Sequence, residues 1–118
     1  MGKIITNDVG KIIISKEVIA TLAGIAAMEC YGVVGMASQK LKDGIADLLG
    51  MEALSKGVQV VIKNDQLSIN VYIIVGYGTK ISEIAHNVID KVRYIVEKHT
   101  GIPVDYVQIY VQGVRVVD

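Results

Sequence analysis

Several residue types that mark particular protein classes are scarce in this sequence. Of its 118 residues one is cysteine and one is proline, tryptophan and phenylalanine are absent, and six tyrosines are the only aromatic residues. The single cysteine, Cys30, excludes an intramolecular disulfide and favours a reducing, cytoplasmic location. Because no proline-rich linker divides the chain, we expect one continuous domain over residues 1–118.

Net charge and long hydrophobic runs are also missing. Twelve Lys and Arg balance twelve Asp and Glu, which counts against nonspecific nucleic-acid binding, because such binding needs clustered positive charge. The longest uncharged stretch, Gln66–Thr79, has 14 residues, whereas a membrane helix needs about 20. We therefore expect no direct membrane insertion. A 52% apolar chain without net charge favours association, so we expect a homo-oligomer.

Residue patterns predict two hairpins and a final strand. Short β-branched runs at 3–6 and 11–14 indicate a hairpin or an extended arm. Apolar and polar residues alternate on both sides of Asn64-Asp65, which predicts a second hairpin that begins after Gly57 and ends at Val75. The last strand is expected over 104–112, with a bulge or bend at Gly113.

Helical spacing predicts three helices. The first follows Ser15 as N-cap and ends at Gly32. The second is short, covers 39–49 and lies between Ser38 and Gly50. The third covers about 80–99, with Thr79 as N-cap and Gly101 after its end. The expected apolar stripe of the first helix is Val18, Leu22, Ile25 and Ala26, widened by Ile19 and Ala23, and that of the third is Ile81, Ile84, Ala85, Val88, Val92, Ile95 and Val96.

The order of these elements predicts the fold class. Hairpin connections and short strands favour an α+β domain, in which a mostly antiparallel sheet forms one layer and helices pack on one of its faces. The predicted order is βαββαβ-like, with an extra short helix.

No constellation of catalytic or metal-binding residues is apparent. His86 and His99 are 13 residues apart on one predicted helix, which places their side chains about 140° apart around its axis. Cys30 lies at the end of another helix, and we interpret it as a structural thiol whose replacement leaves activity intact. We therefore expect no catalytic residue, no cofactor, and no metal or nucleotide site.

The segment Gly76-Tyr77-Gly78-Thr79 precedes the third helix. Glycines before a helix N-terminus can form an anion site, because backbone N–H groups and the helix dipole favour negative charge there. The same glycines also allow a sharp turn from strand to helix. The segment lacks the longer glycine loop and the Lys-Ser or Lys-Thr pair of a nucleotide-binding loop, and the turn is the preferred interpretation.

One face of the predicted sheet carries amides and tyrosines but no charge. If the aliphatic residues of the strands face the helices, the other face displays Ser68, Asn70, Tyr72, Tyr106, Gln108, Tyr110 and Gln112. Tyrosine is enriched at interfaces, and interface cores contain few charges. We predict an interaction surface formed by Tyr72, Tyr106, Gln108, Tyr110 and Gln112. An ordinary solvated face and a stacking platform for single-stranded RNA are the alternatives.

Four groups of residues in fixed order are spread over nearly the full length of the chain, namely Gly10–Ala26, Gly32–Met36, Val71–Ala85 and Thr100–Val114. In these groups the chain resembles the alkaline shock protein family, the envelope stress response proteins of Gram-positive-type bacteria. The resemblance implies no catalysis. It implies a small cytoplasmic protein that associates with itself or with partners, in some members near the membrane through a separate anchor protein.

We therefore expect a non-enzymatic, self-associating interaction or scaffold protein, without specific nucleic acid as a partner. An RNA-binding module of KH-like or RRM-like type is the first alternative. A small anion-binding regulator that uses Gly76–Thr79 is the second.

Overall fold

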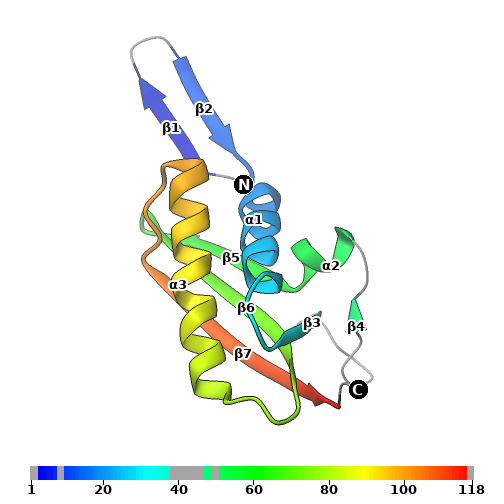
Figure 1. The fold of residues 1–118 in the computed structure, drawn as a ribbon. Coiled ribbons are helices and arrows are strands. Elements are labelled where there is room, and N and C mark those ends of the chain that lie inside the picture. Colours follow the sequence, from blue (N-terminus) through cyan, green and yellow to red (C-terminus); the bar gives the residue numbers. More distant parts are fainter. Residues whose placement is uncertain (1–2, 8–9, 38–46, 49–50, 117–118) are drawn as a thin grey trace.

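The computed structural model describes residues 3–7, 10–37, 47–48 and 51–116. Figure 1 shows a sheet with two long helices on one face and a separate β-hairpin that projects from one end. In chain order the elements are β1 (Lys3–Asn7), β2 (Gly10–Ile14), α1 (Lys16–Met28), β3 (Val33–Ala37), β4 (Asp47–Leu48), α2 (Met51–Lys56), β5 (Val58–Lys63), β6 (Gln66–Gly76), α3 (Ile81–Thr100) and β7 (Tyr106–Arg115). The predicted α+β class is confirmed.

Strand β6 is the centre of a five-stranded sheet. On one side β7 runs parallel to it, from Ser68 opposite Tyr106 to Gly76 opposite Arg115. On the other side β5 and β3 pair with successive parts of β6, and both are antiparallel to it. The short strand β4 pairs with β3 on its other side and is antiparallel to it. The sheet is thus mostly antiparallel, and β6–β7 is its one parallel pair among the described strands.

The second hairpin forms as the sequence predicts. Asn64 and Asp65 have φ angles of 52° and 62°, as required for the two central residues of a type I′ turn. This turn sets the register of β5 on β6, so that Val58, Val60 and Ile62 face the same side as Val71, Ile69 and Leu67.

The predicted helix over 39–49 is not supported where it can be checked. Residues 38–46 and 49–50, which include both expected end residues, lie outside the described part of the chain, and 47–48 form the strand β4. The short helix α2 instead covers Met51–Lys56. Pairing of Asp47 and Leu48 with β3 is a tertiary contact, and tertiary contacts override helical spacing over such short segments.

Helix α1 begins as predicted, and its buried face overlaps the predicted stripe at Ile19, Ala23 and Ala26 but is rotated away from Val18 and Ile25. The Ser15 hydroxyl oxygen accepts a hydrogen bond from the Val18 amide at 3.2 Å, which confirms the N-cap. The helix ends at Met28, and Gly32 lies in the following turn at φ +91°, so the predicted end is wrong. Val18 and Ile25 are exposed, and the buried residues are Ile19, Ala20, Ala23, Gly24, Ala26 and Ala27.

For helix α3 the predicted C-terminal end is confirmed, whereas the predicted N-cap residue is wrong. Gly101 adopts a left-handed conformation with φ 75°, and its amide donates to the Glu97 carbonyl oxygen. The residue at the N-cap position is Lys80, without a side-chain cap. Thr79 is not the cap, because its hydroxyl donates to the carbonyl oxygen of Gly76 at 2.6 Å. Of the predicted stripe Ile84, Val88, Val92 and Val96 are buried, whereas Ile81 is exposed.

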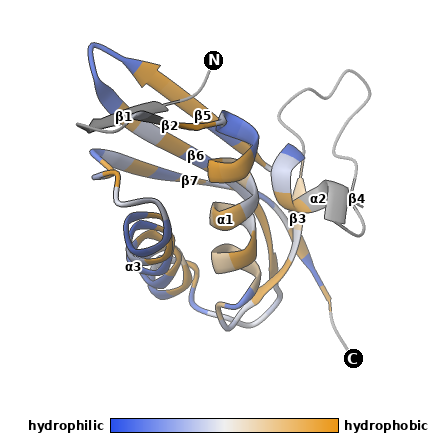
Figure 2. Cartoon of the chain, turned by 90° about the horizontal axis from the view of Figure 1, so that it is seen from above, coloured by the Kyte–Doolittle hydropathy of each residue, from blue (hydrophilic) through white to orange (hydrophobic). Residues whose placement is uncertain are grey.

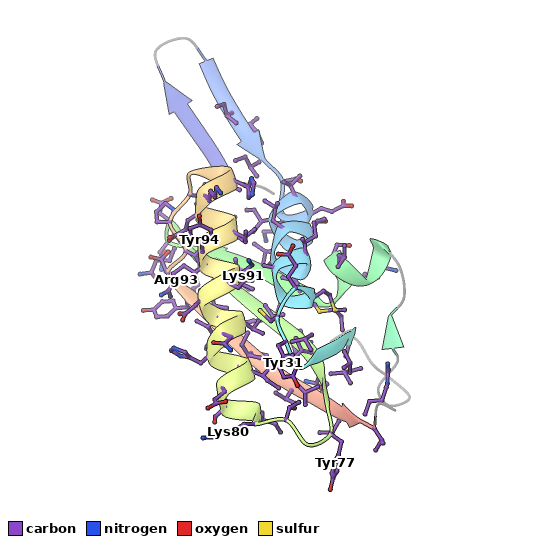
Figure 3. All side chains as sticks on the ribbon, viewed as in Figure 1. Tyr31, Tyr77, Lys80, Lys91, Arg93 and Tyr94 are labelled. Carbon is purple, nitrogen blue, oxygen red and sulfur yellow. The ribbon has the colours of Figure 1, made fainter. Side chains whose placement is uncertain are left out.

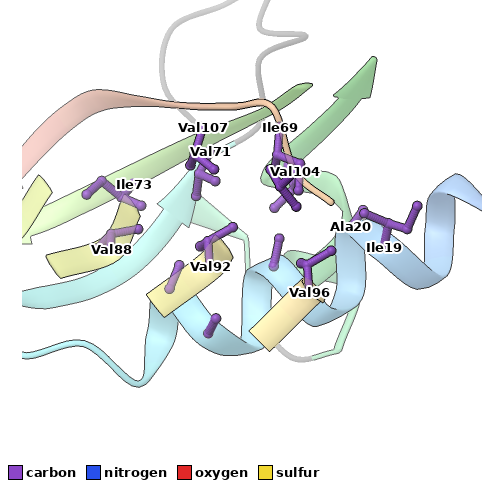
Figure 4. Packing of buried hydrophobic residues seen from close by; sticks show 14 of the residues in the cluster. Ile19, Ala20, Ile69, Val71, Ile73, Val88, Val92, Val96, Val104 and Val107 are labelled. Atoms are coloured by element: carbon purple, nitrogen blue, oxygen red, sulfur yellow. The ribbon is translucent and has the colours of Figure 1, made fainter. Parts of the chain in front are cut away.

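The core fills the space between the two helices and the sheet. Figure 4 shows Val88, Val92 and Val96 of α3 and Ile19 of α1 packing toward the strands. From β6 the side chains of Leu67, Ile69, Val71, Ile73 and Val75 enter this core, each 0–1% exposed. Seen from above, α1 and α3 form one layer and the sheet forms the other (Figure 2). The predicted two-layer arrangement with helices on one face is confirmed.

The first hairpin, β1–β2, is a separate two-stranded sheet with Asn7 opposite Gly10. Ile12 and Ile13 are 51% and 68% exposed. They are neighbours in a strand and so point to opposite faces, which means that both faces of the hairpin expose apolar surface. The prediction of a hairpin at this position is confirmed.

Candidate interaction surface

The face of the sheet that is turned away from α1 and α3 is called the second face below. Because side chains alternate along a strand, burial of Ile69, Val71 and Ile73 against the helices places the intervening residues on the second face. The register between strands then brings the following side chains together: Gln59 and Val61 from β5, Ser68, Asn70 and Tyr72 from β6, and Tyr106, Gln108 and Tyr110 from β7. None of the described helices covers this face (Figures 1 and 2).

A stacked pair of tyrosines lies on the second face where β6 and β7 meet. The rings of Tyr72 and Tyr110 have centroids 4.8 Å apart and planes at 12°. Tyr72 is only 8% exposed and belongs to a small apolar cluster with Ala37 and Ile74, whereas Tyr110 is 40% exposed. Burial of its ring, and secondly the neighbouring Tyr110, raises the pKa of Tyr72. Tyr72 thus packs beside Tyr110 and is largely buried, whereas Tyr110 is the accessible member of the pair.

Hydrogen bonds between neighbouring side chains hold the surface in one arrangement. The Tyr110 hydroxyl donates to Gln108 Oε1 at 3.0 Å. The amide Nδ2 of Asn70 donates to Gln59 Oε1, also at 3.0 Å. Side chains that are already oriented lose less conformational entropy when a partner binds.

The five residues predicted as an interaction surface differ in their exposure to solvent. Tyr106, Gln108 and Tyr110 are exposed, and Tyr106 is the most accessible of the three tyrosines at 57%. Gln112 is half-buried, and it is the extra residue of a bulge, since Val111 lies opposite Ile73 but Gly113 opposite Ile74. Sequence reasoning did not include Gln59, although the register of the predicted hairpin already placed it beside Asn70.

Most backbone amides of the turn between β6 and α3 donate hydrogen bonds within the protein. The N–H groups of Gly76, Tyr77 and Thr79 donate to the carbonyl oxygens of Gly32, Arg115 and Gly76, respectively. These three groups therefore cannot donate to an anion in this conformation. Gly78 has φ +90°, which agrees with the interpretation of the segment as a sharp turn.

Cys30 and the histidines lie apart from the second face. Cys30 is partly buried, and its thiol donates to the Ala26 carbonyl oxygen at 3.4 Å. His86 pairs with Asp90 on the exposed side of α3, with 3.3 Å between Nε2 and Oδ2. In the part of the chain that the structure describes, no three His, Cys, Asp or Glu side chains gather as metal ligands would. Likewise, no described helix has the length and apolar character needed to cross a membrane.

Comparison with known protein families assigns nearly the whole chain to one family. The model of the alkaline shock protein 23 family matches residues 4–116, and this family is described as having a cell envelope-related function. The chain belongs to this family. The resemblance found in the sequence is thereby confirmed, and the cell envelope is the functional context of the alkaline shock protein 23 family.

Relatives of similar length support this assignment. The uncharacterized protein YloU of Bacillus subtilis is 58% identical over 108 residues, which cover 91% of this chain and 90% of the relative. The uncharacterized protein Spy1614 of Streptococcus pyogenes is 43% identical over 116 residues, 98% of this chain and 95% of the relative. A second Bacillus subtilis relative, the uncharacterized protein YqhY, is 32% identical over 92% of this chain and 80% of its own length. No solved structure matches the chain.

Cys30 of this family member is expected to react slowly. Burial raises its pKa, an effect that Lys91 opposes and Glu29 reinforces, and the thiolate is the reactive form. At pH 8 alkylation by iodoacetamide should be about threefold or more slower than that of free cysteine. The same protein unfolded in urea should react at the free rate. Native protein that reacts as fast as unfolded protein would contradict a structural role, as would loss of association in Cys30→Ser.

Proposed function

We propose that this chain is a non-catalytic scaffold protein of the cell envelope that self-associates through the second face of its sheet. One observation carries the proposal. Tyr106 and Tyr110 are 57% and 40% exposed on a face that no described helix covers, and β7 carries no charged residue before Arg115. A solvated sheet face is normally rich in Lys and Glu, whereas interface cores are rich in Tyr and poor in charge.

The cell envelope-related function of the family supports a proposed location. Proteins with a cell envelope-related function act at or near the membrane, and we expect this chain to work in the cytoplasm close to it. Since no described helix is suited to span a bilayer, the connection to the membrane is proposed to run through a separate anchor protein. A role in the envelope stress response, which the family resemblance implies, belongs to the same proposal.

The test replaces exposed tyrosines of the second face. Tyr106→Ala and Tyr110→Ala should each weaken self-association by about 2 kcal/mol if the residue is a hot spot, which is roughly a 30-fold increase in the dissociation constant. Mass is measured by light scattering over a range of concentrations, and binding of the membrane-anchor protein by pull-down. Tyr72 is a poor choice, because truncation of a buried ring also changes stability.

Tyr94→Ala is the matched control. Tyr94 is 57% exposed, the same as Tyr106, but it lies on α3 at the opposite side of the molecule (Figure 3). The control should leave the mass unchanged. If the two β7 variants fold, keep the wild-type mass and retain the anchor protein, the second face is only solvated and the proposal fails.

A further inference from the structure

One long edge of the sheet is open. β7 pairs with β6 on one side, and none of the described strands pairs with its other side. Exposed edges usually carry charges, prolines or bulges that prevent pairing with another chain. From Tyr106 to Val111 β7 has none of these, and its bulge comes only at Gln112. The edge is therefore suited to accept another strand over six residues.

The pairing of β6 with β7 shows which residues of β7 turn their backbone N–H and C=O groups toward the open edge. The Tyr72 amide donates to the Gly57 carbonyl oxygen on the β5 side, so the neighbouring Val71 and Ile73 turn their amides toward β7. In a parallel ladder the residue opposite such a position points its own N–H and C=O away from the partner strand. Ile109 lies opposite Val71 and Val111 opposite Ile73. Val107, Ile109 and Val111 thus present their backbone donors and acceptors to the open edge.

We propose that this edge pairs with the β7 edge of a second copy, antiparallel and about a two-fold axis. The proposal rests on the self-association proposed above and places the contact at the β7 edge, where Tyr106 and Tyr110 of the second face border the seam. A two-fold axis at Ile109 makes the backbone donors and acceptors of this edge complementary to those of the second copy. Ile109 then pairs with Ile109 of the other chain, and Val107 pairs with Val111 of the other chain. Most stable dimers use such isologous interfaces, and the two sheets would join into one.

The same register matches the side chains of the second face. When Ile109 lies on the axis, Gln108 of each chain lies opposite Tyr110 of the other. Within one chain the Tyr110 hydroxyl already donates to Gln108 Oε1, so the same two groups can exchange hydrogen bonds across the seam. Both second faces also fall on the same side of the joined sheet. The dimer would present one continuous surface with two exposed tyrosines from each chain.

Charges beside the edge are also self-complementary. α3 contacts β7, whereas α1 lies over β5 and β6 and on the other side of α3. Figure 3 shows Lys91 on the side of α3 toward α1 and Arg93 on the side away from it. His86, Asp90 and Glu97 share the side of Arg93, because their spacing brings them within about 60° of it. Asp90, Arg93 and Glu97 thus place charges of both signs beside the edge, where antiparallel helices can pair them, and Glu97 Oε2 also accepts a hydrogen bond from the Val104 amide at 2.8 Å.

A charged residue at the seam provides the first test. Gln108→Lys places two positive charges close to the axis, where like charges across strands are destabilising. We expect the dissociation constant of the dimer, measured by light scattering, to rise by about tenfold or more. Val61→Lys is the control, since Val61 lies on the same face but on β5, at the far edge of the sheet. It should change the dissociation constant by less than about twofold. Equal weakening by both variants would overturn edge pairing in favour of docking through the face.

Disulfide trapping tests the register itself, in a Cys30→Ser background. Gln108→Cys and Tyr110→Cys chains are mixed and oxidised. Residues opposite each other in a non-hydrogen-bonded pair have Cα atoms about 4.5 Å apart, within the range of a disulfide, so a cross-linked heterodimer should form. Tyr106→Cys mixed with Tyr110→Cys is the control, because two residues out of register they are about 8 Å apart and should not cross-link.

The outcomes separate this inference from the proposed function. A protein that is dimeric but shows no preference for the 108–110 cross-link associates through another surface, and the edge proposal alone fails. A protein that stays monomeric at all concentrations overturns both proposals. In that case an extended segment of a different protein is the remaining occupant of the edge.

Discussion

Replacement of Gly24 by alanine is expected to lower the free energy of unfolding by about 2 kcal/mol. The sign is informative, because alanine in a helix interior is normally about 1 kcal/mol more stable than glycine. Gly24 lies in the middle of α1, and a Cβ atom there would overlap the backbone carbonyl group of Leu54 in α2. Backbone cannot move aside as a flexible side chain can, so α2 must shift away from α1.

Gly10→Ala is the matched control for this change. A Cβ atom at Gly10 meets nothing within 4 Å, so its effect on stability should stay within about 0.5 kcal/mol. Both variants are measured by urea unfolding, with the midpoint and the slope compared to the wild type. Stabilisation by Gly24→Ala would show that α2 does not rest on α1 and would contradict the close approach of the two helices.

Ile73→Ala is expected to be the most destabilising single truncation, with a loss of about 3–4 kcal/mol. Ile73 is 0% exposed in the central strand, where Met36 flanks it on one side and Val111 on the other. Neighbours held in strands on both sides cannot collapse into the space left by the side chain. The cost therefore includes a cavity in addition to the lost burial of the methyl and methylene groups.

The exposed Ile13 is the comparison for this truncation. Ile13 is 68% exposed on the projecting hairpin, and Ile13→Ala should alter stability by about 0.5 kcal/mol or less. Thermal and urea unfolding monitored by circular dichroism measure both variants. If the two truncations lower the free energy of unfolding equally, β6 is not the centre of the core.

The elements that the sequence predicted correctly depend on local chemistry. The β5–β6 hairpin follows from alternation around Asn64-Asp65, residues that tolerate the positive φ angles which the turn requires. The start of α1 follows from the Ser15 cap, and the end of α3 from the left-handed Gly101. Each of these signals involves residues close together in the chain, so no knowledge of the partner element was needed.

The candidate surface was predictable only in part. Alternation along β6 and β7 placed the tyrosines and amides on one face, and the register confirms that shared face. It did not show that Tyr72 is buried where it stacks on Tyr110, nor that Gln112 belongs to a bulge. Exposure of a residue depends on neighbours from other strands, and a bulge depends on the fit between two strands.

Local chemistry in the sequence thus determined the two long helices, the two hairpins, the last strand and the division of the sheet into an apolar and a polar face. The tertiary structure decided which face of α1 is buried, that residues 47–48 pair with β3, and that β7 leaves an open edge. The physical reason is the same in each case. α1 is apolar or small on most sides, and a two-residue strand has almost no pattern of its own, so contacts with distant segments choose between arrangements that local preference leaves nearly equal.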